Sequence, residues 1–321
     1  MDKLISYIVP CYNGAKTIHR LLESFLCQTY TQLEIIIVDD GSTDESARVI
    51  ESYRPRFEAL GMRLEYFYQE NKGLGGAIDS GLKLFHGDYL CWIDVDDFLS
   101  PEASEHRMKF LEENPKYAVV SSDAYIFLEG DLEKPIARGA SKLVHNADEN
   151  QFWHLLTANS LFMPGCHMVR TEDFLKVNPT RSIYPARRGQ NWQLLLPVYY
   201  RFPRAFLNEP LFNYLQMKNS MSKDHGDPKK ELYRCDEHLD IITQTLKRME
   251  MTEQDRIKAE HLVQTLFARK KLYIAGRNGL KDIAKEQYRR LKEMNENNKK
   301  DCLQLWCARC WAVRKLYSLR K

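Results

Sequence analysis

Residues 88–97 read DYLCWIDVDD, an apolar run that ends in three aspartates. This run predicts a buried β-strand, and three earlier apolar runs, at residues 4–10, 33–40 and 62–69, predict further strands. Segments with the apolar spacing of helices lie between them. Buried strands that alternate with helices are typical of an α/β fold, in which helices flank both faces of a mainly parallel sheet.

Polar side chains follow each of the four predicted strands. They are Tyr12 and Asn13 after the first strand, Asp39 and Asp40 after the second, residues 69–72 after the third, and residues 94–97 after the fourth. The carboxyl ends of parallel strands meet at one edge of a sheet, and ligands bind beyond that edge. The sequence therefore predicts one binding site built from these four clusters.

The three aspartates of the fourth cluster suit a divalent metal. On a continuous strand, Asp94 and Asp96 point to one face, and Asp97 falls in the following turn. Crowded carboxylates raise one another's pKa unless a cation lies among them. Mg²⁺ and Mn²⁺ take carboxylate oxygens and often bind together with substrate phosphates. The competing interpretation is a solvated turn, where aspartate is common.

The other clusters fit a nucleotide. Asp40 offers a carboxylate that can accept the imide N–H of a pyrimidine base, and the ring of Tyr12 can stack on that base. Lys72 and the glycines that begin at Gly73 suit phosphates. The alternatives are a solvated lysine and glycines that allow close packing of a helix.

Composition and length bound the remaining possibilities. The 321 residues are 44% hydrophobic and 28% charged, as in a globular core domain with an extension. The formal net charge of +3 is too small to predict a nucleic-acid partner. No apolar run reaches the roughly 20 residues of a membrane span. No signal peptide is evident, so the eight cysteines are expected as free thiols in the cytoplasm.

The second half of the chain changes character near residue 226. A strand is predicted at 117–127, a polar loop over the site at 129–148, a helix at 189–202 and short strands at 205–216. From Pro228 the pattern is helical and highly charged. We therefore predict two domains, residues 1–225 and residues 226–321.

Five segments carry a family resemblance. They read IVPCYN (8–13), CQTY (27–30), EIIIVDDGSTD (34–44), QENKGLGGAIDSGL (69–82) and DYLCWIDVDD (88–97). In this order and spacing they resemble the family 2 inverting glycosyltransferases of bacterial surface-polysaccharide type. The resemblance covers residues 4–100 strongly and 101–222 loosely. It implies the GT-A, or nucleotide-diphospho-sugar transferase, fold with a C-terminal helical extension.

The resemblance also implies roles for individual residues. Pro10, Tyr12 and Asn13 would line the nucleotide pocket, Asp40 would contact the base, and Lys72 and Gly73 would lie near ribose and phosphates; Asp94 and Asp96 would form the D-x-D pair. Asp96, with Asp97 as its competitor, would ligate Mn²⁺ or Mg²⁺. Lys218 and Ser220 would reach the diphosphate, unless they belong to an ordinary basic loop.

The implied reaction is inverting, metal-dependent transfer of a sugar from a nucleotide-diphosphate sugar, expected to be a UDP-sugar. The acceptor would be a glycan or a lipid-linked acceptor in cell-surface polysaccharide synthesis. A base must take the proton of the attacking hydroxyl. Many relatives carry an acidic pair near residue 189, but this chain has Gln190 and Asn191, which accept no proton at neutral pH.

Three explanations for this departure remain open. Gln190 and Asn191 only orient the acceptor, or the activity is altered, or the base comes from elsewhere. The substitutes for the base are Asp173, Glu172, His167 and Asp123. Two other function classes also remain, namely a non-catalytic sugar-nucleotide or glycan-binding homologue that lacks its base and, less favoured, a nucleotidyltransferase.

The last 20 residues form a basic, aromatic pattern. Residues 302–321 contain five basic residues and no acidic one, and their apolar residues share one stripe if the segment is a single helix. Such a helix suits peripheral contact with the inner face of a membrane. It equally suits docking on the catalytic domain or on a second copy in a homodimer.

Overall fold

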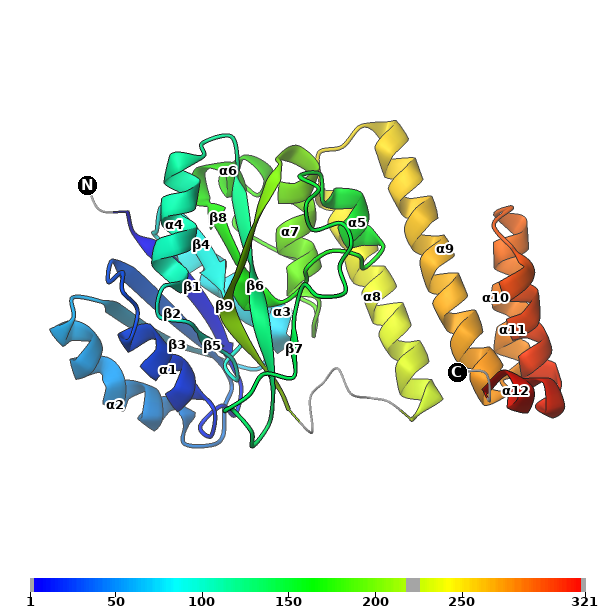
Figure 1. Ribbon diagram of the computed structural model, residues 1–321, viewed down its shortest axis with the longest axis horizontal. Coiled ribbons are helices and arrows are strands. Elements are labelled where there is room, and N and C mark those ends of the chain that lie inside the picture. Colours follow the sequence, from blue (N-terminus) through cyan, green and yellow to red (C-terminus); the bar gives the residue numbers. More distant parts are fainter. Residues whose placement is uncertain (1–2, 218–225, 319–321) are drawn as a thin grey trace. The chain divides into compact units, whose positions relative to one another are not determined.

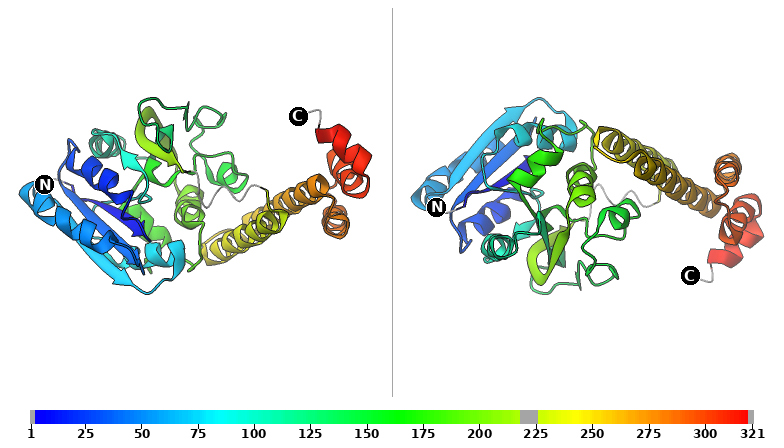
Figure 2. Two further views of the ribbon diagram at one scale, coloured as in Figure 1. Left: turned by 90° about the horizontal axis from the view of Figure 1, so that it is seen from below. Right: turned by 90° about the horizontal axis from the view of Figure 1, so that it is seen from above.

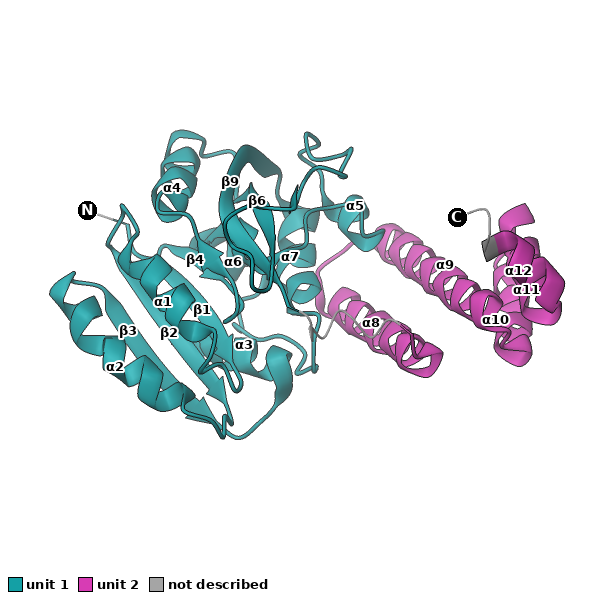
Figure 3. Cartoon of the chain, turned by 60° about the horizontal axis from the view of Figure 1, so that its bottom comes forward, with its two compact units in different colours: residues 1–218 teal, residues 219–321 magenta. Residues whose placement is uncertain are grey.

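The computed structural model describes residues 3–217 and 226–318 (Figure 1). The chain divides into two units, residues 1–218 and 219–321 (Figure 3). The predicted contacts of Lys218 and Ser220 lie outside the described residues.

Within its described residues, the first unit contains a nine-stranded mixed sheet with the order β3-β2-β1-β4-β8-β6-β9-β5, and β7 pairs with β6. The strands are β1 (Ile5–Cys11), β2 (Leu33–Asp40), β3 (Arg63–Gln69), β4 (Tyr89–Trp92), β5 (Phe98–Leu99), β6 (Val119–Leu128), β7 (Ala137–Arg138), β8 (His167–Arg170) and β9 (Arg204–Gln216). The four strands from β3 to β4 are parallel, as the sequence predicts. Beyond them, β8 runs antiparallel to both β4 and β6.

Helices cover both faces of the parallel part. The helices of this unit are α1 (Ile18–Leu26), α2 (Ser46–Ala59), α3 (Gly73–Leu84), α4 (Ala103–Glu113), α5 (Phe152–Leu156), α6 (Thr171–Val177) and α7 (Gln190–Arg201). Side chains alternate along a strand, so β1 serves both faces. Tyr7 and Val9 pack in one core cluster with residues of α1 and α2. Ile8 instead faces α3, where a Cβ on Gly81 would lie 2.4 Å from its Cγ2 atom.

Two predicted strand boundaries are wrong. β4 ends at Trp92, so the aspartates that follow lie in a turn and not on a strand. Residues 204–216 form one strand in place of several short ones, with irregular pairing against β6 at Ser122 and Asp123. The polar segment 129–148 contains β7 and lies along β6, where Gly139 N donates to Ala124 O at 2.8 Å.

The second unit is helical in its described residues. It comprises α8 (Pro228–Arg248), α9 (Glu253–Asn278), α10 (Lys281–Glu293), α11 (Lys299–Arg309) and α12 (Trp311–Ser318). α8 packs beside α9 (Figure 1), and the last three helices pack at the C-terminal end of α9 (Figure 2). Asn298 begins α11 with a capping box that includes Asp301. No described helix has both the length and the apolar character needed to cross a membrane.

The single helix predicted for residues 302–321 is wrong. Cys310 has an extended backbone conformation and separates α11 from α12. The expected continuous stripe is therefore broken, and Cys307 is buried within the unit while Trp306 and Trp311 are each more than 60% exposed.

Candidate active site

The three aspartates gather in the tight turn between β4 and β5. Asp97 N donates to Asp94 O at 3.2 Å, which closes the turn. One carboxylate oxygen from each of Asp94, Asp96 and Asp97 lies within 4.8 Å of the others. The cluster predicted from the sequence therefore exists, but turn geometry and not strand alternation brings the carboxylates together.

Burial makes the charges of this cluster costly. Burial and the nearby charge of Asp96 raise the pKa of Asp94 to about 7. Burial also raises the pKa of Asp96, and burial with the charges of Asp96 and Asp94 raises that of Asp97. Asp97 Oδ1 accepts a hydrogen bond from Leu215 N at 2.8 Å, but its buried Oδ2 has no partner in the described part of the chain.

An orphaned buried carboxylate oxygen beside two other carboxylates fits a hard divalent cation. Mg²⁺ or Mn²⁺ would relieve both the repulsion and the unmet hydrogen-bonding capacity of Asp97. The donor set contains only oxygen, which is the preference of these two ions. Asp94 and Asp96 remain partly exposed, so a ligand can reach the cluster.

Asp40 ends β2 on the same edge of the sheet. The carboxylate is buried, and its Oδ1 accepts from Gln69 Nε2 at 2.7 Å and from Lys72 N at 2.8 Å. No described residue donates to its Oδ2. Asp39 differs, because both of its oxygens accept hydrogen bonds, one of them from the hydroxyl of Tyr66 at 2.7 Å. Asp40 is therefore the member of the pair that keeps an acceptor for a ligand.

The loop after β1 joins the two acidic clusters. Tyr12 is 56% exposed, whereas Pro10 is buried within β1. Asn13 adopts a positive φ of 51° and connects two loops: its N–H donates to Ser42 Oγ and its Oδ1 accepts from Thr43 N, both at 2.8 Å. The oxygen of Asn13 is thus occupied by protein, while the ring of Tyr12 remains accessible.

Two further contacts tie this loop and α1 to the aspartate turn. A Cβ on Gly14 would lie 3.0 Å from Val95 Cγ2, so the loop passes directly beside the turn. Arg20 Nη1 donates to Asp96 O at 3.4 Å. Sequence reasoning missed Arg20, because nothing in the neighbouring sequence distinguishes it from other helix-surface charges.

The glycines at the start of α3 are explained by close packing. Gly75 N donates to Ala186 O at 2.8 Å, and a Cβ on Gly75 would lie 2.5 Å from the same oxygen. Gly73 has a φ of +77°, and its Cβ would lie 3.0 Å from Arg187 Cα. This contact places the exposed Arg187 beside Lys72, a neighbour that sequence reasoning missed although the pair at 187–188 is visibly basic.

The start of α7 is attached to the same edge. Asn191 Oδ1 accepts from Trp92 Nε1 at 2.6 Å, and its Nδ2 donates to Phe162 O at 2.8 Å. Because Trp92 precedes the aspartate turn by two residues, α7 begins close to the acidic cluster. Both polar atoms of the Asn191 side chain are occupied by these hydrogen bonds. The side chain of the buried Gln190, in contrast, has no hydrogen-bond partner among the described residues.

The structure does not bring Asp173 to this edge. β8 runs antiparallel to β4, with Arg170 opposite Tyr89, so α6 begins at the amino end of the parallel strands. Asp173 Oδ1 instead accepts from Lys176 Nζ at 2.7 Å. The prediction of Asp173 as the base is therefore wrong, and Glu172, its neighbour in α6, lies at the same distant end.

The other two candidate bases are also unavailable to a substrate. His167 is fully buried and stacked on Trp92, and burial with the charges of Arg204 and Arg107 lowers its pKa well below the ordinary value. Asp123 is buried and accepts from Arg138 Nε at 2.7 Å. Both oxygens of Asp123 accept protein hydrogen bonds, and His167 Nε2, which has no partner among the described residues, is sealed from solvent, so neither residue is accessible to a substrate.

Residues 6–177 match the family model described as Glycosyl transferase family 2. The chain belongs to this family. A relative is the glycosyltransferase GlyA of Streptococcus pneumoniae, which is 35% identical over 235 residues, or 70% of this chain and 32% of GlyA. The match spans about a third of the length of GlyA and of two glycosyltransferases of Rickettsia typhi and Rickettsia conorii.

Solved structures confirm the fold of this family 2 chain. Staphylococcus aureus TarS 1–349 in complex with UDP-GlcNAc superposes with a TM-score of 0.63 at 16% identity, over 99% of this chain and 92% of that one. The mannosyltransferase PcManGT of Pyrobaculum calidifontis, solved with GDP-Man and Mn²⁺, gives 0.56 at 15% identity, over 99% and 83%. The predicted GT-A fold is therefore confirmed.

Proposed function

We propose that this family 2 chain is an inverting, metal-dependent glycosyltransferase that uses a UDP-sugar. The acceptor is a hydroxyl of a glycan or a lipid-linked glycan in cell-surface polysaccharide synthesis. The observation that carries the proposal is the aspartate turn with a buried, orphaned oxygen on Asp97, on the same sheet edge as the half-engaged carboxylate of Asp40.

The donor nucleotide is held by groups that the protein itself leaves unused. Asp40 Oδ2 accepts the imide N–H of uracil, and the exposed ring of Tyr12 stacks on the base. Lys72 is an exposed cation at the start of α3, and the exposed Arg187 lies beside it; both offset the charge of the diphosphate. These contacts select a pyrimidine nucleotide diphosphate and orient it along the edge of the sheet.

Asp96 and Asp97, with Asp94 beside them, would hold the metal. When bound there, Mn²⁺ or Mg²⁺ neutralises charge on the leaving diphosphate. The backbone N–H of Leu215 in β9 fixes one oxygen of Asp97, so its second oxygen has a defined position before any ligand arrives. This pre-organisation lowers the cost of assembling the donor site.

The acceptor lies near the start of α7. Gln190 is the polar side chain there without a partner among the described residues, and its amide can both donate to and accept from a sugar hydroxyl. It positions the attacking oxygen and takes no proton, so the proton of the hydroxyl passes to a phosphate oxygen of the departing diphosphate. An oxygen that attacks from the side opposite the diphosphate inverts the anomeric carbon.

The absence of an acid at Gln190 and Asn191 favours one alternative. A chain that binds sugar nucleotides or glycans without transferring sugar needs the donor site and no base. Both functions predict that the chain binds UDP, but only the glycosyltransferase transfers sugar. Sugar transfer must therefore be measured separately from nucleotide binding.

Calorimetric titration with UDP, with and without Mn²⁺, tests the donor site. Wild type is expected to bind UDP more tightly with Mn²⁺, Asp96→Asn to lose the metal dependence, and Asp40→Asn to lose affinity with or without metal. Asp173→Asn is the matched control, because it removes a carboxylate at the far edge of the sheet. If UDP does not bind, or if Asp173→Asn weakens binding as much as Asp96→Asn does, the proposal fails.

Transfer is tested with UDP-sugars and glycan acceptors, and NMR reads the configuration of the product's anomeric carbon. Inversion supports the proposal, and retention contradicts it. Gln190→Ala is expected to raise the KM for the acceptor while UDP affinity stays unchanged. UDP binding without turnover on any donor would instead support the binding-protein alternative.

The end of the second unit suits a lipid-linked acceptor. Trp306, Trp311 and Leu316 are each more than 60% exposed, and Arg309 and Lys315 accompany them. Tryptophans beside cations favour the interface of an anionic membrane. Co-sedimentation should be stronger with phosphatidylglycerol vesicles than with phosphatidylcholine vesicles, and Trp306→Ser with Trp311→Ser should reduce it. Equal binding to both vesicles would exclude this contact.

A further inference from the structure

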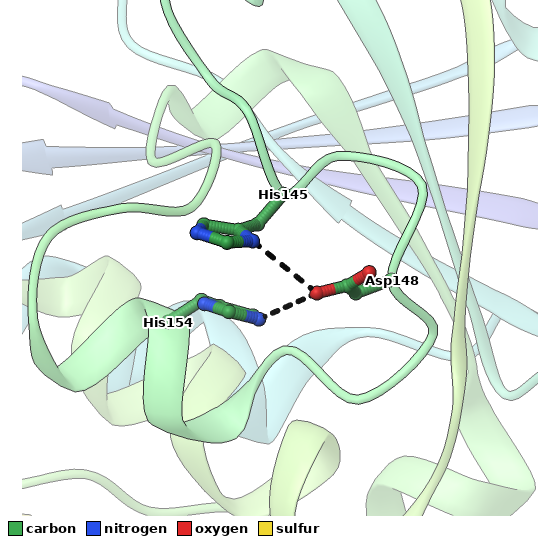
Figure 4. A group of neighbouring side chains, drawn as sticks. All are labelled: His145, Asp148 and His154. Atoms are coloured by element: carbon green, nitrogen blue, oxygen red, sulfur yellow. Dashed lines mark hydrogen bonds and ion pairs between the residues drawn. The ribbon is translucent and has the colours of Figure 1, made fainter.

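A second cluster of potential metal ligands lies outside the aspartate turn. His145 and Asp148 belong to the loop that follows β7, and His154 belongs to α5 (Figure 4). Asp148 Oδ2 lies 2.8 Å from His154 Nε2 and 3.4 Å from His145 Nδ1. One donor atom from each residue lies within 4.8 Å of the other two. Three side chains thus converge on one point although none of them serves the proposed transfer.

The backbone around this cluster is fixed from inside. Gln151 is fully buried, and its Nε2 donates to the carbonyl oxygen of His145 at 2.8 Å and to that of Asp148 at 2.7 Å. Its Oε1 accepts from Ser160 Oγ at 2.7 Å, which fixes the amide itself. A single buried residue therefore holds the backbone of two donors, and the third follows within one turn of α5. Such support keeps the backbone of the ligands in place before a metal binds.

The chemistry of the donors selects the metal. Two imidazole nitrogens and one carboxylate oxygen suit Zn²⁺, whereas the oxygen-only aspartate turn suits Mg²⁺ or Mn²⁺. We propose that His145, Asp148 and His154 bind a divalent transition metal of the Zn²⁺ class, with water completing the coordination. This site goes beyond the proposed sugar transfer and does not depend on it.

The two imidazoles must separate when the metal binds. Their rings now stack with centroids 4.2 Å apart and planes inclined by 13°. A ring nitrogen binds metal in the plane of its ring, so at least one ring must turn out of the stack. The side chain of His145 is 45% exposed, and Gln151 holds only its backbone, so its side-chain torsions are free to make this change.

The loop that carries the site also forms a wall of a cavity of about 660 Å³ beside β6 and β9. Asn146 lies between the ligands in sequence, and it accepts from the buried Arg204 through its carbonyl oxygen and Oδ1, both at 3.3 Å. Metal binding would therefore stiffen the wall of this cavity and the contact with Arg204. The site would act as a cross-link within the loop.

Zn²⁺ titration by calorimetry on full-length protein without a histidine tag, and without nucleotide, tests the site. Changes outside the ligand shell already alter metal affinity by about 10- to 100-fold. Loss of a ligand in His154→Gln or Asp148→Asn is therefore expected to weaken Zn²⁺ binding by about 100-fold. His106→Gln is the matched control, because His106 pairs with Glu209 at 2.7 Å and the described residues offer it no third donor.

Asp96→Asn separates this site from the donor site and is expected to leave Zn²⁺ affinity unchanged. Hydrogen exchange of residues 145–154 should slow on addition of Zn²⁺ in wild type and in His106→Gln, but not in His154→Gln. The proposal is overturned if Zn²⁺ does not bind, if His154→Gln binds it as wild type does, or if Asp96→Asn alone abolishes binding. Because no nucleotide is present, none of these results bears on UDP binding.

Discussion

Asp94→Asn should stabilise the metal-free protein increasingly as the pH rises. The pKa of the Asp94 carboxyl is 3.8 in an unfolded chain and about 7 in the folded protein, because of burial and the charge of Asp96. The folded state therefore binds the proton more tightly. The stabilisation that this bound proton gives the folded state is complete below pH 3.8 and is lost as the pH rises through 7. At about 1.4 kcal/mol per pKa unit, the loss reaches about 4 kcal/mol at pH 8.

Asparagine has the same shape and no charge, so the variant escapes this loss. Urea unfolding in EDTA, followed by tryptophan fluorescence, should give a stability difference of about 1 kcal/mol or less at pH 4 and about 4 kcal/mol at pH 8. Mn²⁺ at about 100 times its Kd should stabilise wild type by about 3 kcal/mol at pH 8. Mn²⁺ should stabilise Asp94→Asn much less, so the stability difference between the variant and wild type becomes smaller.

The pH dependence carries the test. A variant that is equally more stable at pH 4 and pH 8 would show that the side chain matters for packing and not for its charge. A variant that is less stable than wild type at pH 8 without metal would refute the reasoning altogether, since it would mean that the ionised Asp94 stabilises the folded protein.

Three further perturbations have defined outcomes. Asp79→Asn should show the opposite pH trend and destabilise by about 1–3 kcal/mol at pH 7 and less at pH 4 in urea unfolding, because hydrogen bonds outweigh burial and lower the pKa of Asp79. Asn191→Leu should leave Trp92 Nε1 unpaired and lower stability by about 1–3 kcal/mol in thermal unfolding, with an altered near-UV circular dichroism spectrum. Gly75→Ala should cost about 1–3 kcal/mol in urea unfolding, because its methyl group meets Ala186 O at 2.5 Å; an unchanged midpoint would contradict this close approach.

The sequence is most informative about features that depend on neighbouring residues in the chain. An apolar run bounded by polar residues predicts a buried strand without knowledge of its neighbours, and four such runs with helices between them specify a parallel sheet. The polar residues that follow these strands then meet at one edge. This pattern predicts that Asp40 and residues 94–97 lie at the same edge, and the parallel pairing of β1 with β2 and with β4 brings them there.

The base could not be found in this way, because strand direction is a tertiary property. β8 has only four residues, and nothing in HMVR shows whether it runs with or against β4. Because β8 runs antiparallel to β4, Asp173 lies at the opposite edge of the sheet from the aspartate turn. Likewise, the role of Asn191 depends on Trp92, a residue 99 positions away whose indole N–H needs an acceptor once it is buried.

The sequence by itself determined the family, the parallel half of the sheet and the residue types at its edge. The apolar residues of each segment determine whether it is buried, so its burial can be predicted from the sequence alone. Only the tertiary structure decided which of those residues remain free for ligands. Asp39 and Asp40 are adjacent and chemically identical, yet both oxygens of Asp39 accept protein hydrogen bonds while Asp40 keeps one open. That difference arises from donors on other strands and loops, which meet the two carboxylates only when the chain folds.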